Sequence, residues 1–342
     1  MPKALRIAGW LLALLMFGAA GAAGAQSPAE QQQQRRLEQP GNNAPVWREV
    51  RSGNQGYTSI PGREVGVLVQ SAGETWRQLR NGPVTFYGGW LIVIVLLILA
   101  AIYFTKGPVK LHDKPSGRML ERFTLAQRWA HWTMGISFVV LGLTGLTILF
   151  GKYVLLPVIG YTLFAWLTSL AKNLHNFVAP LFAVSLPVFI VMFIRDNLPK
   201  GYDFGWFLKA PGFFAGKHIA SGRFNAGEKA WFWGGVVVLS IALVVSGAIL
   251  LFPNFDQVRA TMQQASVVHM TAAVLVISAA LGHIYLGTIG VDGAYQAMRT
   301  GYVDEVWAKE HHEYWYDEVK GGARAAAGGA VPAGAPHMKE KQ

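Results

Sequence analysis

The chain has 342 residues, no cysteine and a formal net charge of +11. Hydrophobic residues make up 52% of it and charged residues 14%, whereas soluble domains carry roughly 25% charged residues. Without cysteine, the chain cannot form disulfides, bind iron–sulfur clusters through thiolates or attach c-type haem. Its basic residues are not interleaved with aromatic ones, so the composition indicates a protein of the lipid bilayer and no nucleic-acid partner.

The first 25 residues have the pattern of a secretory signal peptide. A basic start precedes a short apolar stretch, and Ala23-Gly24-Ala25 forms a cleavage site before Gln26. An uncleaved anchor helix is the alternative. Residues 26–84 are polar, with a glutamine run at 31–34, and are predicted to form a periplasmic arm.

Five apolar stretches follow, each long enough to cross a hydrocarbon core of roughly 30 Å. They run from about Tyr87 to Phe104, Trp129 to Phe150, Leu174 to Ile194, Trp231 to Phe252 and Val267 to Ile289. The predicted fold class is an all-α membrane protein. A transmembrane four-helix bundle occupies 129–290, and one extra N-terminal transmembrane helix at 85–105 brings the mature chain to five helices.

The connections between these stretches differ in charge, which predicts the side of the membrane on which each lies. Segments 106–128 and 195–230 are rich in Lys and Arg, whereas the other connections carry only Lys152, Lys172 and Arg259. Because basic residues collect on the cytoplasmic side, the linker 106–128 and the tail 291–320 are predicted to be cytoplasmic. The mature N-terminus is then periplasmic, as expected in a bacterial inner membrane. Residues 321–342 are predicted to be disordered.

Four histidines lie in the apolar stretches: His131, His175, His269 and His283. On one helix, the 14-residue spacing of His269 and His283 returns to within roughly 40° of the same face, roughly 21 Å along the axis. The predicted topology places His131 level with His283 near the cytoplasm, and His175 level with His269 near the periplasm. Two imidazole pairs at two depths predict two bis-histidine haems b in the four-helix bundle.

Other uses of these histidines stay open from the residues alone. Interhelical hydrogen bonds or a proton path would also place histidines in a membrane. Zinc or copper would require further cysteine or carboxylate ligands nearby. Outside the apolar stretches, His112 and His218 are expected to be solvated, and His311 and His312 to serve packing or partner contact.

Several motifs carry a resemblance to a known family. Ala130-His131-Trp132 opens the second apolar stretch, Asn225-Ala226-Gly227-Glu228-Lys229 precedes the fourth, and Trp307-Ala308-Lys309-Glu310-His311-His312 follows the fifth. Over about residues 118–320 the chain resembles the gamma subunit, a cytochrome b, of membrane-bound respiratory formate dehydrogenases. Long members of that family with an N-terminal extension also look similar to it.

The resemblance implies a dihaem bundle with four axial ligands. His175 and His269 would ligate the iron on the periplasmic side, and His131 and His283 the iron on the cytoplasmic side. The chain would then be an electron-transfer subunit of anaerobic respiration, with formate chemistry on a partner. A molybdopterin (Mo or W) alpha subunit would oxidise formate, and an iron–sulfur beta subunit would pass the electrons to the periplasmic haem.

The same resemblance implies that the cytoplasmic haem reduces a quinone. The residues expected near the quinone are Asn225, Gly227, Glu228 and Lys229, together with His283. The nearest alternative is the cytochrome b subunit of a nickel–iron hydrogenase or of another respiratory reductase. An alternative of another class is a haem-free membrane anchor or scaffold. A transporter fits less well, because no apolar stretch pairs acidic residues.

Overall fold

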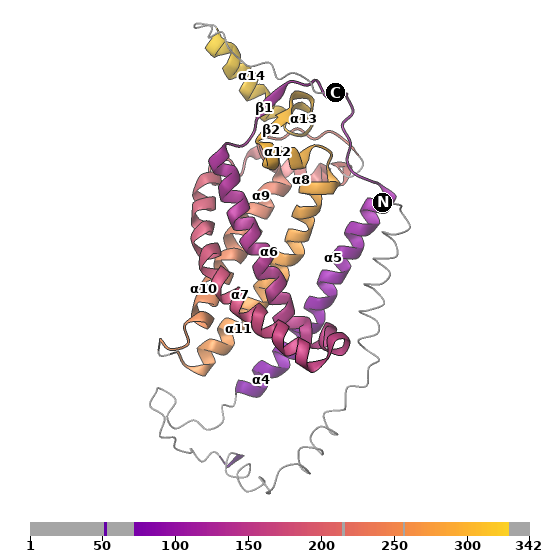
Figure 1. Ribbon diagram of the computed structural model, residues 1–342. Coiled ribbons are helices and arrows are strands. Elements are labelled where there is room, and N and C mark those ends of the chain that lie inside the picture. Colours follow the sequence, from indigo (N-terminus) through magenta and orange to yellow (C-terminus); the bar gives the residue numbers. More distant parts are fainter. Residues whose placement is uncertain (1–50, 53–71, 214–215, 256, 328–342) are drawn as a thin grey trace. The chain divides into compact units, whose positions relative to one another are not determined.

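The structure, a computed structural model, describes residues 51–52, 72–213, 216–255 and 257–327 (Figure 1). The predicted signal peptide at 1–25 and most of the predicted arm at 26–84 lie outside these residues. The described part is mostly helical, and five of its helical segments are long and apolar enough to cross a membrane. This confirms the all-α membrane fold expected from the five apolar stretches.

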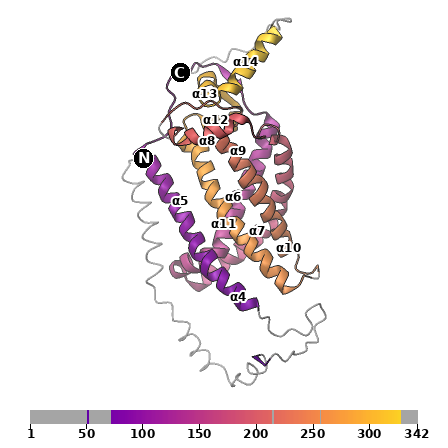
Figure 2. The ribbon, with the colours of Figure 1, turned by 180° about the vertical axis from the view of Figure 1, so that it is seen from behind.

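The first long segment joins α4 (Ala72–Leu79), the π-helical turn η1 (Arg80–Val84) and α5 (Thr85–Thr105), which follow one another in Figure 2. The second and third are α6 (Leu125–Val154) and α7 (Leu156–Phe193). The fourth joins α9 (Ala226–Ala230), the π-helical η2 (Trp231–Leu239) and α10 (Ser240–Leu251). The fifth joins α11 (Arg259–Tyr285) and the π-helical η3 (Leu286–Gly290).

Helical structure begins earlier than predicted in two places. α4 and η1 fall inside the stretch 26–84 that was expected to be a polar arm. α4 is a polar helix. Its Arg77 donates a hydrogen bond of 2.8 Å to Glu74, one turn earlier, and such pairs stabilise a helix without raising its hydropathy. α7 begins at Leu156, well before the expected start at Leu174. Two helical pieces join there at Gly160, whose φ of 74° is readily adopted only by glycine.

Contacts divide the chain into two compact units, and each long segment contributes residues to both. Unit 1 comprises Met1–Ile94, Thr133–Leu186 and Leu239–Ser278. Unit 2 comprises Val95–Trp132, Pro187–Val238 and Ala279–Gln342. His175 and His269 fall in unit 1, whereas His131 and His283 fall in unit 2, so each predicted pair belongs to a single unit.

The interior of unit 1 mixes apolar side chains with hydroxyl groups. Phe182, Leu186 and Val276 are buried there, beside a set of buried hydroxyls on Ser137, Thr144, Ser185, Ser240, Ser246 and Ser278. Hydroxyls such as that of Ser278 donate to a carbonyl one turn earlier in their own helix, in this case Val274 at 2.7 Å. Buried hydroxyls that are satisfied within their own helix are compatible with an apolar surrounding.

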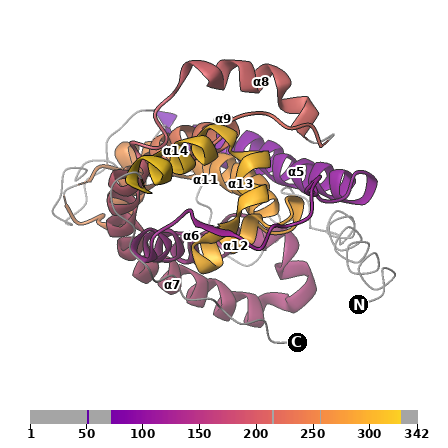
Figure 3. The ribbon, with the colours of Figure 1, turned by 90° about the horizontal axis from the view of Figure 1, so that it is seen from above.

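Unit 2 adds short elements to the long segments. β1 (Met119–Glu121) pairs antiparallel with β2 (Tyr302–Asp304), and Leu120 lies opposite Val303. The sheet lies beside α12 (Ala294–Thr300) and α13 (Glu305–His311) in Figure 1. The side chain of Asp304 caps α13 by accepting from the backbone N–H of Val306 at 2.8 Å. Figure 3 shows α8 (Gly201–Phe213) flanking α9.

A buried cation organises the core of unit 2. The guanidinium of Arg122 lies 4.9–5.7 Å from the ring centroids of Phe123, Phe224 and Trp307. It donates to the carbonyl of Arg223 at 2.9 Å and to Glu228 Oε1 at 3.2 Å. Aromatic faces and two acceptors compensate the charge, so Arg122 holds the start of α9 against the C-terminal helices.

The structure describes only the start of the segment 321–342 that is predicted to be disordered. α14 (Glu313–Ala327) continues into the segment 321–342 that was expected to be disordered. Its last three residues, 325–327, are alanines, and alanine has the highest helix propensity of all residues. Helix therefore continues to Ala327, and the rest of the predicted segment lies outside the described residues.

Candidate functional site

Two histidines from different helices face each other in unit 1. The ring centroids of His175 on α7 and His269 on α11 are 6.2 Å apart, with an interplanar angle of 73°. Glycines allow each ring to approach a neighbouring helix. A Cβ added at Gly145 would lie 3.5 Å from Cε1 of His175, and one added at Gly247 would lie 3.1 Å from Cε1 of His269.

Hydroxyl groups orient both of these rings. Thr144 Oγ1 lies 2.8 Å from Nδ1 of His175, and Ser246 Oγ lies 3.1 Å from Nδ1 of His269. Each hydroxyl already donates to a carbonyl of its own helix, Thr144 to Val140 at 2.8 Å and Ser246 to Ala242 at 2.5 Å. The hydroxyl oxygens are therefore left to accept from Nδ1–H. This assigns the proton to Nδ1 in both rings and leaves the lone pair of Nε2 free for a metal.

A second pair of histidines faces each other in unit 2. The ring centroids of His131 on α6 and His283 on α11 are also 6.2 Å apart, with an interplanar angle of 56°. Aromatic rings flank this pair. Trp231 stacks on His283 at 5.2 Å and 15°, and Trp132 meets the ring of His131 edge-on at 5.3 Å. Within the described part of the chain, the buried Nδ1 of His131 has no hydrogen-bond partner.

Both pairs fit the axial positions of a haem iron. Two metal–nitrogen bonds of about 2 Å each, plus the radii of two imidazole rings, give a centroid separation of about 6 Å. No cluster of three or more His, Cys, Asp or Glu able to hold a metal occurs among the described residues. Zinc needs four protein or water ligands, whereas a porphyrin supplies four nitrogens of its own and requires two from the protein. The donor set therefore fits haem better than a bare metal ion.

Glycines next to two ligands leave room for a flat macrocycle. Gly135 follows His131 by about one helical turn, and Gly282 directly precedes His283. A Cβ added at either glycine would meet no atom outside its own helix within 4 Å. The open surroundings of both glycines therefore agree with a bulky planar group at this pair.

Except for His283 on α11, the residues expected near a quinone lie at the start of α9. Asn225 is its N-cap: Oδ1 of Asn225 accepts from the N–H of Glu228 at 2.9 Å, and Glu228 Oε2 accepts from the N–H of Asn225 at 2.7 Å. Glu228 also pairs with Arg122, and the buried Lys229 pairs with Asp203 on α8 at 2.7 Å. Trp206 on α8 contacts Gly227, where an added Cβ would lie 3.3 Å from its ring.

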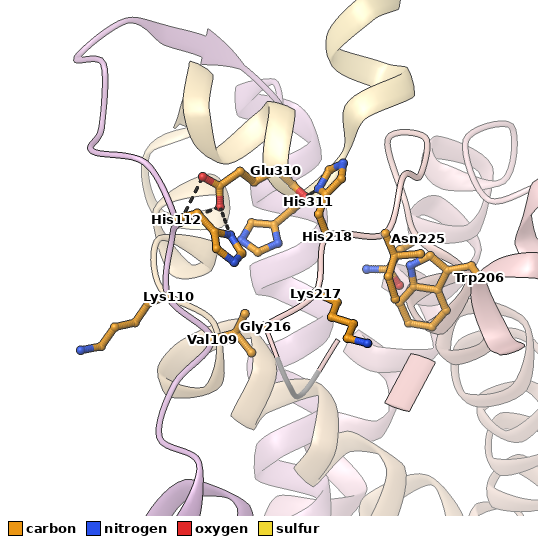
Figure 4. Close-up of a pocket in the computed structure, with 11 residues that line it drawn as sticks. Val109, Lys110, His112, Trp206, Gly216, Lys217, His218, Asn225, Glu310 and His311 are labelled. Carbon is orange, nitrogen blue, oxygen red and sulfur yellow. Dashed lines mark hydrogen bonds and ion pairs between the residues drawn. The ribbon is translucent and has the colours of Figure 1, made fainter. Parts of the chain in front are cut away.

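A pocket opens beside Asn225. Its lining includes Trp206 from α8, His311 from α13, and residues of two loops. Figure 4 shows Asn225 and Trp206 on one side of this pocket and His311, His112 and Glu310 on the other. The lining residues are Val109, Lys110, His112, Trp206, Gly216, Lys217, His218, Ile219, Asn225, Glu310 and His311. Gly227, Glu228 and Lys229 are not among them, so Asn225 is the member of this predicted set that lines the pocket.

Titratable residues gather around this pocket in a way that spacing alone does not predict. His218, which was expected to be solvated, has a side chain that is 39% exposed, and its Nε2 lies 2.9 Å from Glu313 Oε2. His112 Nδ1 lies 3.2 Å from Glu310 Oε2. Burial lowers the pKa of His311 to about 4. These contacts join loops to the C-terminal helices across long sequence separations, so only the folded chain brings the residues together.

Comparison with known proteins gives two kinds of match. Residues 122–301 match the family model described as prokaryotic cytochrome b561. The cytochrome b556(fdo) subunit of Escherichia coli formate dehydrogenase is 33% identical over 205 residues, 58% of this chain and 92% of the relative. The cytochrome b556(Fdn) subunit of its nitrate-inducible formate dehydrogenase is 29% identical over 214 residues, 59% of this chain and 93% of the relative. The cytochrome b556 subunit of Haemophilus influenzae formate dehydrogenase is 26% identical over 202 residues, 56% of this chain and 79% of the relative.

The fold and the paired imidazoles thus define a multi-pass, all-α membrane protein of the cytochrome b class, a class that implies haem b. The matches confirm the resemblance drawn from the motifs. The chain belongs to the prokaryotic cytochrome b561 family and, within it, to the cytochrome b subunits of formate dehydrogenases.

Proposed function

We propose that the chain is the haem b, quinone-reactive membrane subunit of a formate dehydrogenase. His175 and His269 would hold one haem b, and His131 and His283 a second. The observation that carries this proposal is the equal 6.2 Å separation of both ring pairs. When bound, haem b would supply a one-electron carrier, with the paired histidines as its protein ligands.

The chain's own residues prepare these sites. Thr144 and Ser246 hold the Nδ1 protons of His175 and His269, so that Nε2 is presented to the iron. Trp231 and Trp132 fix the planes of His283 and His131. This arrangement favours ligands that keep the same orientation in both oxidation states, as electron transfer requires.

We infer the partners of the chain from its lack of cysteine and from the names of its relatives. It has no cysteine, so any iron–sulfur cluster held by thiolates must lie on another subunit. Its relatives are named as subunits of formate dehydrogenases. We infer an iron–sulfur beta subunit that delivers electrons to the His175–His269 site. A molybdopterin (Mo or W) alpha subunit would oxidise formate.

Charge supports an orientation in which unit 2 faces the cytoplasm, because segments 106–128 and 195–230 carry most of the basic residues between the spans. Moving an electron inward against an interior-negative potential costs about 2.3 kcal/mol per 100 mV. Quinone reduced at the inner face would take its protons from the cytoplasm. Reconstituted vesicles should therefore build up a membrane potential, negative on the proton-uptake side, during formate oxidation.

Haem stoichiometry tests the haem assignment. The purified wild-type complex should contain two haems b per chain, and the His269→Ala variant one. His337→Ala, which alters a histidine outside the apolar stretches, is the control and should retain both. Two haems in the His269→Ala variant would refute the ligand assignment. Wild-type protein without b-type absorption bands would favour the haem-free scaffold.

Asn225 is the candidate quinone contact that can be tested cleanly. Aspartate and asparagine are equally good N-caps, so Asn225→Asp keeps the cap of α9 and removes the Nδ2 donor. We expect quinone reduction to fall at least tenfold while both haems and the melting temperature are retained. Gln127→Glu, which alters another amide of unit 2 away from the pocket, provides a control. Unchanged quinone reduction in Asn225→Asp would remove Asn225 from the site.

A further inference from the structure

The outer face of α8 is apolar and exposed. Phe204, Phe207 and Leu208 are 74%, 49% and 71% exposed, respectively. Their positions fall within about 100° of one another around the helix axis, so the three side chains form one face. A helix face that meets water normally carries charged and polar side chains. The outer face of α8, defined by these three residues, therefore calls for an apolar partner.

The opposite, inner face of α8 anchors the helix to the start of the fourth membrane-spanning segment. The buried Asp203 pairs with Lys229 of α9 at 2.7 Å. The buried Trp206 contacts Gly227, where an added Cβ would lie 3.3 Å from the indole. A charged group thus lies on the protein side of α8 and large apolar groups lie on its outer side. This is the reverse of the pattern in a helix that covers a water-exposed surface.

Unit 2 holds α8 where two membrane-spanning segments end. α8 begins at Gly201, shortly after α7 ends at Phe193. Between them, the carbonyl of Asn197 accepts from the indole N–H of Trp233, in the fourth segment, at 2.8 Å. Figure 3 shows α8 side-on, next to α9. The ends of membrane-spanning segments lie at the level of the lipid headgroups, so α8 lies at that level too.

The length of α8 excludes a further crossing of the membrane. Its 13 residues span about 20 Å, whereas the hydrocarbon core is roughly 30 Å thick. Apolar segments of this length either lie in a protein core or rest in the membrane interface. Because its outer face is exposed, α8 is not a core helix. An interfacial position is left.

Two lysines give the outer face a positive border. Lys200 directly precedes α8, Lys209 directly follows Leu208, and both are exposed. Among the described residues, the nearby carboxylates are already paired, Asp196 with Arg223 and Asp203 with Lys229. An apolar face with a cationic border complements the acyl chains and the phosphate groups of acidic phospholipids. This match of charge, together with the level of α8, favours a lipid over a protein partner.

We propose that α8 is an interfacial helix that binds acidic phospholipids. Phe204, Phe207 and Leu208 insert into the leaflet on the basic side of the membrane, and Lys200 and Lys209 bind lipid phosphate groups there. Long lysine side chains suit this arrangement, because their methylene stems can lie on apolar groups while the ammonium reaches the headgroups. The inference does not rest on the proposed function, since it requires neither haem nor quinone.

The lack of cysteine in the chain permits a test with a single label. In the full-length chain, Leu208→Cys is labelled with nitrobenzoxadiazole and placed in nanodiscs of phosphatidylcholine and phosphatidylglycerol. Quenching is measured with a nitroxide on the acyl chain of one lipid or the other, at equal mole fractions. Glu318→Cys is the control position, because Glu318 is exposed on the polar helix α14.

The border is tested by adding Lys200→Gln/Lys209→Gln to the labelled chain. Lys114→Gln/Lys309→Gln is the matched control, since it removes two exposed lysines of unit 2 that lie outside α8. All four lysines are exposed, so the melting temperature should match that of the parent chain in both variants.

We expect nitroxide lipids to quench the label at position 208 at least fivefold more than the label at position 318. Nitroxide phosphatidylglycerol should quench position 208 at least twofold more than nitroxide phosphatidylcholine. That excess should disappear in Lys200→Gln/Lys209→Gln and persist in the lysine control. Equal quenching at positions 208 and 318 would overturn the insertion of α8, and a blue-shifted but unquenched label would show that protein covers the face instead. Equal quenching by the two lipids, or an excess that survives in Lys200→Gln/Lys209→Gln, would overturn the binding of acidic phospholipids by these lysines.

Discussion

The indole of Trp231 stacks on the imidazole of His283, with ring centroids 5.2 Å apart and an interplanar angle of 15°. Trp231 opens the π-helical segment η2, so the wider turn of that segment sets where the indole lies. A stack of this kind contributes about 0.5–1.5 kcal/mol beyond area burial. It restrains the rotation of His283, whereas hydroxyl groups perform this task for His175 and His269.

Replacing Trp231 should therefore affect one haem and spare the other. In Trp231→Leu we expect the electron paramagnetic resonance signal of the haem that we propose for His131 and His283 to broaden or shift, because the ring of His283 would be free to rotate. The signal of the second haem should stay unchanged. Trp166→Leu serves as the control, since Trp166 is highly exposed on α7. Identical spectra for wild type and Trp231→Leu would show that the stack has no influence on the ligand.

Removing the hydroxyl of Thr144 should weaken the other haem. Thr144→Val keeps the shape of the side chain but leaves Nδ1 of His175 without its acceptor. Loss of such an outer contact costs about 10- to 100-fold in metal affinity. Haem loss to apomyoglobin should therefore become faster for one of the two haems. In the control Thr147→Val, on the same helix, the lost hydroxyl bonds only the carbonyl of Leu143. Equal rates of haem loss in both variants would contradict the assigned tautomer.

The buried ion pair of Lys229 and Asp203 should behave as a structural unit. Both side chains are nearly buried, and Lys229 Nζ contacts both carboxylate oxygens. Removing one partner of a buried pair costs about 3–5 kcal/mol, because the other charge is left uncompensated. Lys229→Met should therefore lower the thermal midpoint more than the double variant Lys229→Met/Asp203→Asn. In the wild type, the carboxylate of Asp203 accepts a hydrogen bond from the N–H of Lys200. In the double variant, the amide oxygen of the new asparagine can still accept this bond. If Lys229→Met instead lost affinity for a quinone-analogue inhibitor and kept its thermal midpoint, the result would support a direct contact between Lys229 and the quinone.

The buried His312 and the partly buried His311 should make unit 2 sensitive to acid. Burial lowers the pKa of His311 to about 4 and that of His312 well below its ordinary value. Unfolded histidine binds a proton near pH 6.5, so the unfolded state gains stability as the pH falls from about 6.5 towards 4. In that window each histidine lowers the free energy of unfolding by up to about 1.4 kcal/mol per pH unit. Above about pH 6.5 the histidine is neutral in both states, and this loss of stability is absent. Thermal unfolding should therefore depend less steeply on pH between about 7 and 5 in His312→Asn. An unchanged slope would contradict the prediction.

Hydropathy was sufficient to predict the five long segments, because a bilayer demands long apolar helices and each of these is continuous enough to be recognised. It was insufficient where other forces build structure. The salt-bridged turn at Glu74 and Arg77, the joint at Gly160 and the alanines at the end of α14 each add helix where hydropathy is low or interrupted. The division of the chain into arm, linker, bundle and tail stays a prediction.

The histidine pairs were accessible from the sequence because helix periodicity and topology together assign each histidine a depth. The hydroxyl groups that orient these histidines could not be predicted from the sequence. Thr144 precedes His175 by 31 residues and Ser246 precedes His269 by 23, so nothing local links them. The same holds for His218 and Glu313, which meet only because α14 packs back against the loop after α8. Contacts between distant segments depend on packing, which a single sequence does not report.

The pairing of β1 with β2 has a consequence for biogenesis. Met119 lies opposite Asp304, so the partner of the first strand is synthesised after all five long segments. Until then β1 has an open edge, and the aromatic rings around Arg122 lack Trp307. We therefore expect nascent chains that stop short of this strand to insert their helices and yet remain substrates for membrane proteases. Translation of the last part of the message, rather than insertion of the helices, would then be the checkpoint for maturation.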